Sequence, residues 1–193
     1  TYELPAFSFA IATMNPIERG QGTFPLSEAA TDRFAIMVNI GYLPTAEEQK
    51  LVNFDFKRVR LNPLMSKERI IQLRAVIGEK VFLHERLGQY IQQLVAATRP
   101  YNPDTDWLVH SPSPLVERGV DLGASPRAII CWGRLVKVWT LLHRERTEVY
   151  PEDIQDLAPY ILGHRIWLGP HAASHGLTTE AVIQDIVERV PIS

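Results

Sequence analysis

The chain has 193 residues, of which 46% are hydrophobic and 22% are charged, and its formal net charge at pH 7 is −2. These fractions are typical of a globular protein and exclude a disordered one, and the length suits one ordinary domain or two small domains. The slightly acidic balance argues against a dedicated nucleic-acid-binding protein, because such proteins usually carry a basic surplus.

The first part of the chain is predicted to be α/β. Residues 7–13 and 34–43 are short, nearly continuous apolar runs, which is the pattern of strands that are covered on both faces. Between them, Ser27 is a candidate N-cap for a short helix that reaches Arg33. Because two strands cannot form a stable sheet by themselves, we expect residues 1–62 to be the end of a larger sheet.

Residues 63–193 show the pattern of an all-helical unit, so we place the boundary between two units before residue 63. One helix is predicted to begin with Ser125 as N-cap and Pro126 at its first position. Its apolar residues run nearly all round, which indicates the buried central helix. Residues 150–165 start with a proline and two acidic residues, typical of a helix N-terminus, and we expect Pro159 to divide this segment into two helices.

Asn15 is the first residue that could carry chemistry. It follows the first apolar run, and a polar side chain just past the carboxyl end of a buried strand lies where open α/β sheets bind ligands. An amide can also hold a water molecule, because it donates and accepts hydrogen bonds at once. The alternative is that Asn15 simply turns the chain before Pro16.

Two arginines are further candidates. Arg33 follows Asp32 at the end of the short predicted helix, where it could pair with its neighbour on the surface or supply positive charge to a phosphoryl group in an adjacent subunit. Arg127 falls in the first turn of its predicted helix, where the helix dipole opposes a cation. A nearby phosphate or carboxylate would explain this placement; alternatively, the side chain extends into solvent.

The other candidates favour structural roles. His171 and His175 are four residues apart in an expected loop with no third ligand in the pattern, so we predict no metal site. Cys131, the single cysteine, is expected to be an inert core thiol and suits a reducing, cytoplasmic compartment. The sequence contains no apolar run that approaches bilayer-spanning length and no G-x-x-x-x-G-K-[ST] phosphate-binding motif.

Three stretches together resemble the MoxR family of AAA+ ATPases. FAIATMNPIERGQGTFPLSEAATDRF (residues 9–34) is similar to the family pattern F-x-[VI]-I-A-T-x-N-P-I-E-x-x-G-T-[YF]-P-L-x-E-A-x-x-D-R-F. ATRPYNPDT…LGASPRA (residues 97–128) and VYPEDIQDLAPYILGHRI (residues 149–166) resemble two further segments of that family. Because the resemblance covers essentially the whole chain with long motifs, the chain is identified as a member of this family.

The resemblance implies a role for each of three residues. Asn15 matches sensor 1, which helps to position the water that attacks the γ-phosphate of ATP. Arg33 matches the arginine finger, which reaches the ATP site of the adjacent subunit. Arg127 matches the sensor 2 arginine of the helical lid, which couples nucleotide state to lid position.

The implied fold is an α/β fragment, namely the last strands of an AAA+ core in residues 1–62, followed by an all-α helical lid bundle in residues 63–193. The family's Walker A and Walker B segments lie upstream of sensor 1. We therefore expect this chain to be the C-terminal half of the ATPase and to be inactive alone.

The intact protein is expected to use ATP and Mg²⁺, to form a ring with neighbouring AAA+ subunits, and to remodel or mature partner proteins in a chaperone-like way. The resemblance implies a hexamer and a partner with a von Willebrand factor A domain; nucleic-acid and membrane partners are not expected. Two alternatives stay open. The chain could be a non-catalytic lid or interaction module, or it could donate an arginine finger in trans without a nucleotide site of its own.

Overall fold

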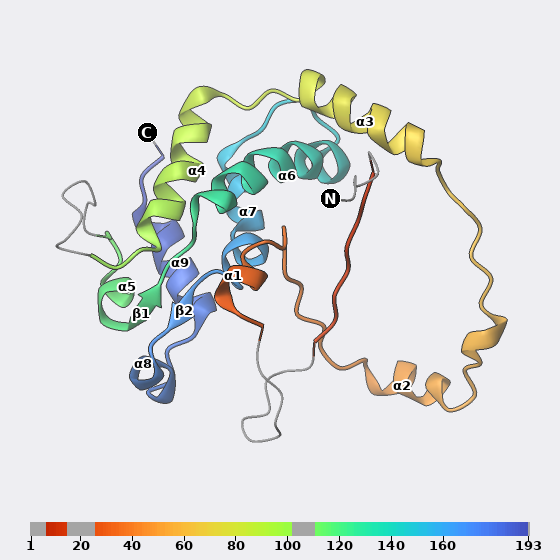
Figure 1. Ribbon diagram of the computed structural model, residues 1–193, viewed down its shortest axis with the longest axis horizontal. Helices are drawn as coiled ribbons and strands as arrows, with labels where there is room; N and C mark the ends of the chain where they lie inside the picture. The colour runs from red at the N-terminus through yellow and green to blue at the C-terminus, as the bar shows by residue number, and fades with distance from the viewer. Residues whose placement is uncertain (1–6, 15–25, 102–110, 193) are drawn as a thin grey trace, which may run out of the picture.

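The computed structural model describes residues 7–14, 26–101 and 111–192, and this part of the chain is mainly helical (Figure 1). The elements in chain order are α1 (Glu28–Thr31), α2 (Thr45–Leu51), the 3-10 helix η1 (Phe56–Arg58), α3 (Lys67–Lys80), α4 (Glu85–Ala97), α5 (Pro114–Gly119), β1 (Val120–Leu122), α6 (Pro126–Arg144), α7 (Pro151–Leu162), β2 (Trp167–Leu168), α8 (Pro170–Ser174) and α9 (Thr179–Arg189). The described residues do not include Asn15.

The hydrophobic core lies in the second half of the chain, around α6. This helix packs against α3, α4 and α7, and α9 packs against α4 and α7. Figure 1 shows α4, α6, α7 and α9 gathered into one bundle. Its centre consists of fully buried side chains, among them Tyr90, Leu94, Trp132, Val136, Ile154, Ile161 and Ile186. The predicted helical bundle is thereby confirmed, whereas a unit boundary before residue 63 stays a prediction.

Helix α6 begins where the sequence predicts. The Ser125 hydroxyl accepts a hydrogen bond from the backbone N–H of Arg127 at 3.2 Å, a cap that typically contributes about 1 kcal/mol. The helix is central, but it buries only one stripe, and Ile130 and Leu142 on its other faces are exposed. Neither α6 nor any other helix in the described part of the chain is long and apolar enough to cross a membrane.

Pro159 does not divide the segment that follows Tyr150, so that prediction is wrong. Helix α7 is continuous from Pro151 to Leu162, with Pro159 inside it. An internal proline removes a helical hydrogen bond and costs about 3 kcal/mol. The residues on both sides of it, including Ala158 and Ile161, are buried in the core. Packing of one continuous apolar face therefore holds the helix together across the proline.

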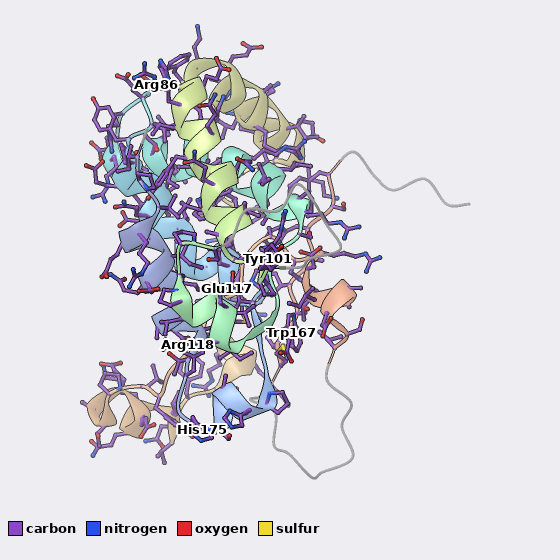
Figure 2. The ribbon with its side chains drawn as sticks, turned by 90° about the vertical axis from the view of Figure 1, so that its left-hand side faces the viewer. Arg86, Tyr101, Glu117, Arg118, Trp167 and His175 are labelled. Atoms are coloured by element: carbon purple, nitrogen blue, oxygen red, sulfur yellow. The ribbon has the colours of Figure 1, made fainter. Side chains whose placement is uncertain are left out.

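Strands β1 and β2 form a two-stranded antiparallel sheet beside α5. On α5, the two carboxylate oxygens of Glu117 accept hydrogen bonds from the backbone N–H groups of Tyr101 and Ser111, each at 3.2 Å. Figure 2 shows Tyr101 and Glu117 next to one another. Because Tyr101 and Ser111 flank residues 102–110, one side chain joins the two ends of that segment.

The first part of the chain differs from the sequence-based prediction in its helix and in its strands. Helix α1 ends at Thr31, before Arg33, and Ser27 precedes it without a side-chain cap hydrogen bond. Residues 7–13 and 34–43, which were both predicted to be strands, form neither helix nor strand. A strand requires a hydrogen-bonded neighbouring strand, and no described strand pairs with either run. Many of their apolar side chains are exposed, among them Phe9, Ile11, Ile40 and Tyr42. Figure 1 shows the chain passing from α1 through α2 in a wide arc outside the bundle before it reaches α3.

The central position of Trp132 in α6 yields a first prediction. Its side chain is fully buried, so Trp132→Ala should lower the free energy of unfolding by about 3 to 5 kcal/mol through lost packing. Ile130→Ala on the same helix is the matched control, because Ile130 is 58% exposed and its truncation should change stability little. Urea unfolding monitored by circular dichroism measures both. Equal effects of the two substitutions would contradict the placement of the core.

Candidate functional site

Four side chains from distant parts of the sequence meet at the N-terminus of α6: Asp32, Ser125, Arg127 and Arg165. Asp32 is the C-cap of α1, and Arg165 follows α7. The Asp32 carboxylate accepts hydrogen bonds from the Ser125 hydroxyl at 2.8 and 2.9 Å, from Nη1 of Arg127 at 3.0 Å and from Nε of Arg165 at 3.2 Å. We call these four residues the Asp32 cluster.

Arg165 is the buried member of the Asp32 cluster. Its side chain is 2% exposed, so its charge has to be compensated inside the protein. Nε donates to the Asp32 carboxylate, Nη1 to the backbone carbonyls of Ala35 and Ile161, and Nη2 to those of Asp32 and Phe34. Because a guanidinium has five N–H donors, Arg165 is fully satisfied. Four of its five acceptors lie in the short stretch that begins at Asp32.

Two further contacts attach the same stretch to α7 and the turn after it. The backbone N–H of Met37 donates to the carbonyl of Tyr160 at 3.0 Å, and Nε2 of His164 lies 3.1 Å from the carbonyl oxygen of Phe34. Since a carbonyl only accepts, Nε2 carries the proton. Burial lowers the pKa of His164 below its ordinary 6.5, and the charge of Arg165 lowers it further. His164 is therefore neutral at pH 7.

Asp32 is ionised at neutral pH. Burial alone raises the pKa of its carboxyl, but hydrogen bonds from Ser125 and Arg127 and the charge of Arg165 outweigh this effect, so the pKa lies below its ordinary 3.8. The positive end of the α6 dipole also favours a negative charge here. Asp32 is thus the carboxylate that the sequence left open as a partner for Arg127, while a phosphate partner stays a prediction.

Arg127 and Arg165 contact the same carboxylate from very different environments. The Arg127 side chain is 59% exposed, and among the described residues its guanidinium donates only to Asp32. The remaining N–H groups of Arg127 are therefore available to a ligand. A guanidinium at a helix N-terminus suits phosphate, because it adds charge-assisted hydrogen bonds to the positive end of the helix dipole. This end of α6 could accordingly hold a phosphate group.

Arg33 does not pair with Asp32 in the described structure, so the interpretation of the two as a surface ion pair is wrong. The Arg33 guanidinium is exposed, and its Nη1 donates to the carbonyl of Ala29, one turn earlier in α1. The carboxylate of Asp32 is already taken by residues of the helical bundle. The role of Arg33 as an arginine finger stays a prediction. So does the role of Asn15, which lies outside the described residues.

The turn that carries Ser125 is held by the end of α4. The Thr98 hydroxyl accepts a hydrogen bond from the backbone N–H of Ala124 at 2.8 Å, and Nε of Arg99 donates to the Ala124 carbonyl at 2.9 Å. Gly123 passes so close to Thr98 that a Cβ atom there would overlap the Thr98 carbonyl oxygen. The ATR and GASPRA stretches of the sequence thus meet in space and fix the start of α6.

Three residues were predicted to have structural roles, and in the described structure none of them binds the Asp32 carboxylate: His171, His175 and Cys131. His171 and His175 stack with their ring centroids 4.2 Å apart, and α8 forms where the sequence predicted a loop. Within the described ranges, no three His, Cys, Asp or Glu side chains are grouped to hold a metal ion. Burial raises the pKa of the Cys131 thiol, which contacts the carbonyl oxygen of Ala35 at 3.4 Å.

Sequence reasoning identified Arg127 but gave no role to Thr98 or Arg165, and for Asp32 it considered only a surface ion pair with Arg33. Thr98, Asp32 and Arg165 all lie within the stretches that resemble the MoxR family. The signal was therefore present in the ATR, DRF and GHR motifs. What the sequence lacks is the information that these motifs meet around one carboxylate.

Known proteins match this chain in sequence. Residues 113–186 match the family model of the AAA lid domain. The chain is 34% identical over 195 residues to the uncharacterised protein YeaC of Bacillus subtilis, covering all of this chain and 55% of YeaC. It is 28% identical over 202 residues to the chaperone MoxR1 of Mycobacterium tuberculosis, covering all of this chain and 48% of MoxR1. The chain belongs to the MoxR family of AAA+ ATPases.

A solved structure also matches this MoxR-family chain. The crystal structure of a presumed ATPase from Cytophaga hutchinsonii superposes with a TM-score of 0.74 at 33% sequence identity, covering 93% of this chain and 52% of the other. The chain spans about half the length of the curated relatives it matches. The AAA lid match begins at residue 113 and thus includes the Ser125 and Arg127 side of the Asp32 cluster.

The close approach of Gly123 to Thr98 gives a second prediction. Gly123→Ala should lower the free energy of unfolding by about 1 to 3 kcal/mol, because the new methyl group would overlap backbone atoms that cannot move aside. Gly133→Ala in α6 is the control: its methyl group would meet only Leu83, at 3.9 Å, and should stabilise the helix by up to about 1 kcal/mol. Urea denaturation of both variants measures the difference. A neutral Gly123→Ala would contradict the close approach.

The lowered pKa of His164 gives a third prediction. Below pH 6.5 the unfolded chain binds a proton that the folded protein does not, so stability should fall as the pH drops through 6.5 and further below it. The slope for one group approaches about 1.4 kcal/mol per pH unit. His164→Gln keeps a donor near the Phe34 carbonyl and does not titrate, so its stability should fall less over this range. Thermal unfolding at each pH compares the variants, and identical slopes would contradict the prediction.

Proposed function

We propose that this chain forms the lid and the end of the ATPase core of a MoxR-type AAA+ protein that hydrolyses ATP to remodel or mature partner proteins. The observation that carries the proposal is the position of Arg127. It lies at the N-terminus of α6, more than half exposed, and it contacts Asp32, the residue before Arg33. The Asp32 carboxylate thus binds Arg127, the proposed phosphate sensor, and Asp32 directly precedes Arg33, the proposed finger for the neighbouring subunit.

The exposed apolar side chains before α3 support a larger core. Phe9, Ile11, Ile40, Tyr42 and Leu64 are each at least 78% exposed. Large contiguous apolar surfaces on a soluble protein usually mark contacts with another segment or another protein. We infer that the runs at residues 7–13 and 34–43 are strands of the ATPase sheet when the rest of that sheet pairs with them.

ATP and Mg²⁺ are the proposed cofactors of the intact protein. When bound, Mg²⁺–ATP supplies the phosphoryl group for transfer to water. Among this chain's residues, Arg127 is chemically suited to a phosphate oxygen because its guanidinium is exposed at a helix N-terminus. The proposed task of Asn15 is to hold the attacking water with its amide. The proposed task of Arg33 is to place positive charge beside the phosphate in the neighbouring subunit.

The finger role requires an assembly, so neighbouring AAA+ subunits are the first proposed partners, arranged as a hexameric ring. MoxR1, the relative from M. tuberculosis, is named a chaperone, and on that likeness we propose chaperone-like remodelling. A protein with a von Willebrand factor A domain is a further proposed partner. We also propose a cytoplasmic location for the assembly.

A second candidate function is that of an arginine-finger donor in trans or of a non-catalytic lid module. The exposed guanidinium of Arg33 suits the finger donor better than the inert module, because a packing module has no need of it. Mixing this chain with a finger-less, Walker-containing AAA+ partner tests the donor function by restored hydrolysis.

The proposed finger gives a fourth prediction. In the assembled ATPase, Arg33→Ala should lower kcat by about 10³- to 10⁵-fold and leave nucleotide affinity nearly unchanged, because a finger acts on charge that develops in the transition state. Arg86→Ala is the control. Figure 2 places Arg86 at one end of the lid, away from Trp167, which follows Arg165 of the Asp32 cluster by two residues. Steady-state phosphate release and binding of a fluorescent ATP analogue measure the two effects. Near-normal turnover of Arg33→Ala in intact rings would contradict the assignment.

A further inference from the structure

We propose that Arg165, in the helical lid, is a positioning residue for the arginine finger of its own subunit. The inference rests on the proposed function, because it assigns Arg33 the finger role. Arg165 does not reach the ATP of either subunit in this proposal. It acts by holding the backbone on which Arg33 is carried.

The contacts of Arg165 are concentrated on the residues around Arg33. Its guanidinium binds the Asp32 carboxylate and the carbonyls of Asp32, Phe34 and Ala35, so it contacts the residues on both sides of the finger. Its fifth acceptor is the carbonyl of Ile161 in α7. One rigid, planar group therefore joins the last turn of a buried lid helix to the finger segment, residues 32–35.

Helix α1 offers the finger little anchorage of its own. It is four residues long and has no buried residue. The Arg33 guanidinium donates only within α1, to Ala29, among the contacts of the described residues. By contrast, the finger segment is joined to the lid by Arg165 and by His164, both of which are buried. In the described part of the chain, the position of the finger backbone thus follows the lid.

The two arginines on Asp32 are suited to different tasks. Arg127 is exposed and has other N–H groups to offer, so it can exchange the carboxylate for a phosphate. Arg165 is 2% exposed and has all five donors engaged, so it has no free group to exchange. When Arg127 turns to a nucleotide, Arg165 and Ser125 still compensate the charge of Asp32. The attachment of the finger segment therefore survives engagement of the phosphate sensor.

Lysine is the sharpest replacement for Arg165. Arg165→Lys keeps the positive charge, but one ammonium has three donors and cannot reach five acceptors spread over a planar fork. In the full-length ring, kcat should fall by about 10²-fold, the order expected for a displacement of about 1 Å of a catalytic group. Nucleotide affinity should stay within about twofold. Arg189→Lys is the matched control, because Arg189 pairs with Asp185 within α9, away from the finger segment, and it should behave like wild type.

Mixed rings separate positioning from general damage to the lid. A subunit with Arg165→Lys keeps its own ATP site but presents a displaced finger, whereas a subunit with Asn15→Ala has a defective site and an intact finger. Mixing the two should restore hydrolysis above the sum of the separate preparations, because the intact finger serves the intact site. A lid that is merely damaged would impair its own site, and mixing would not rescue it.

The same mixing with Arg33→Ala in place of Arg165→Lys tests the proposed function separately. If Arg33→Ala is rescued by Asn15→Ala and Arg165→Lys is not, the positioning role is wrong and the finger assignment stands. If neither is rescued, the finger assignment itself fails and the inference falls with it. Should Arg165→Lys not fold, as judged by circular dichroism and ring assembly, Asp32→Asn is used instead. It removes the charge that Arg165 binds and should show the same loss of kcat and the same rescue; no rescue would overturn the inference.

Discussion

The ion pair between Asp32 and Arg165 is the constraint on which the arrangement of this chain depends. It joins residues 133 positions apart, with an Nε to carboxylate distance of 3.2 Å. A buried guanidinium is costly unless its charge and every donor are matched, and removing one partner of such a pair typically costs about 3 to 5 kcal/mol. The stretch after α1 must therefore lie against α7, which in turn brings Asp32 to the N-terminus of α6.

Local features of the helices could be predicted from the sequence because their causes are local. Ser125 and Pro126 fix the start of α6 through one hydroxyl and one ring, and the structure confirms this start. Pro159 was misjudged because the cost of one missing hydrogen bond is outweighed by burial of α7 on both sides of it, which depends on tertiary packing. The predicted strands before α3 depend on neighbours in a sheet, and a strand pattern alone does not supply them.

The candidate site could be predicted only in part, for a similar reason. The position of Arg127 in a first helical turn favours a nearby anion, but it does not say which one and leaves a solvent-exposed side chain as the alternative. The answer came from Asp32, which precedes Arg127 by 95 residues. Sequence proximity instead suggested Arg33 as the partner of Asp32. In the described structure, Asp32 binds Arg127 and the buried Arg165, which the fold brings to it, and does not bind the adjacent Arg33.

The carboxylate of Glu117 has a consequence for how the lid tolerates change. It accepts hydrogen bonds from the backbone N–H groups of Tyr101 and Ser111, the residues on either side of 102–110. These contacts with Glu117 hold the chain in place after α4 and before α5, and they do not depend on the number of residues between Tyr101 and Ser111. A change in the number of residues between Tyr101 and Ser111 should therefore leave α4 and α5 in place, as long as both backbone N–H groups still reach Glu117. A peptide tag or a fluorophore inserted there would report on lid movement with little disturbance of the Asp32 cluster.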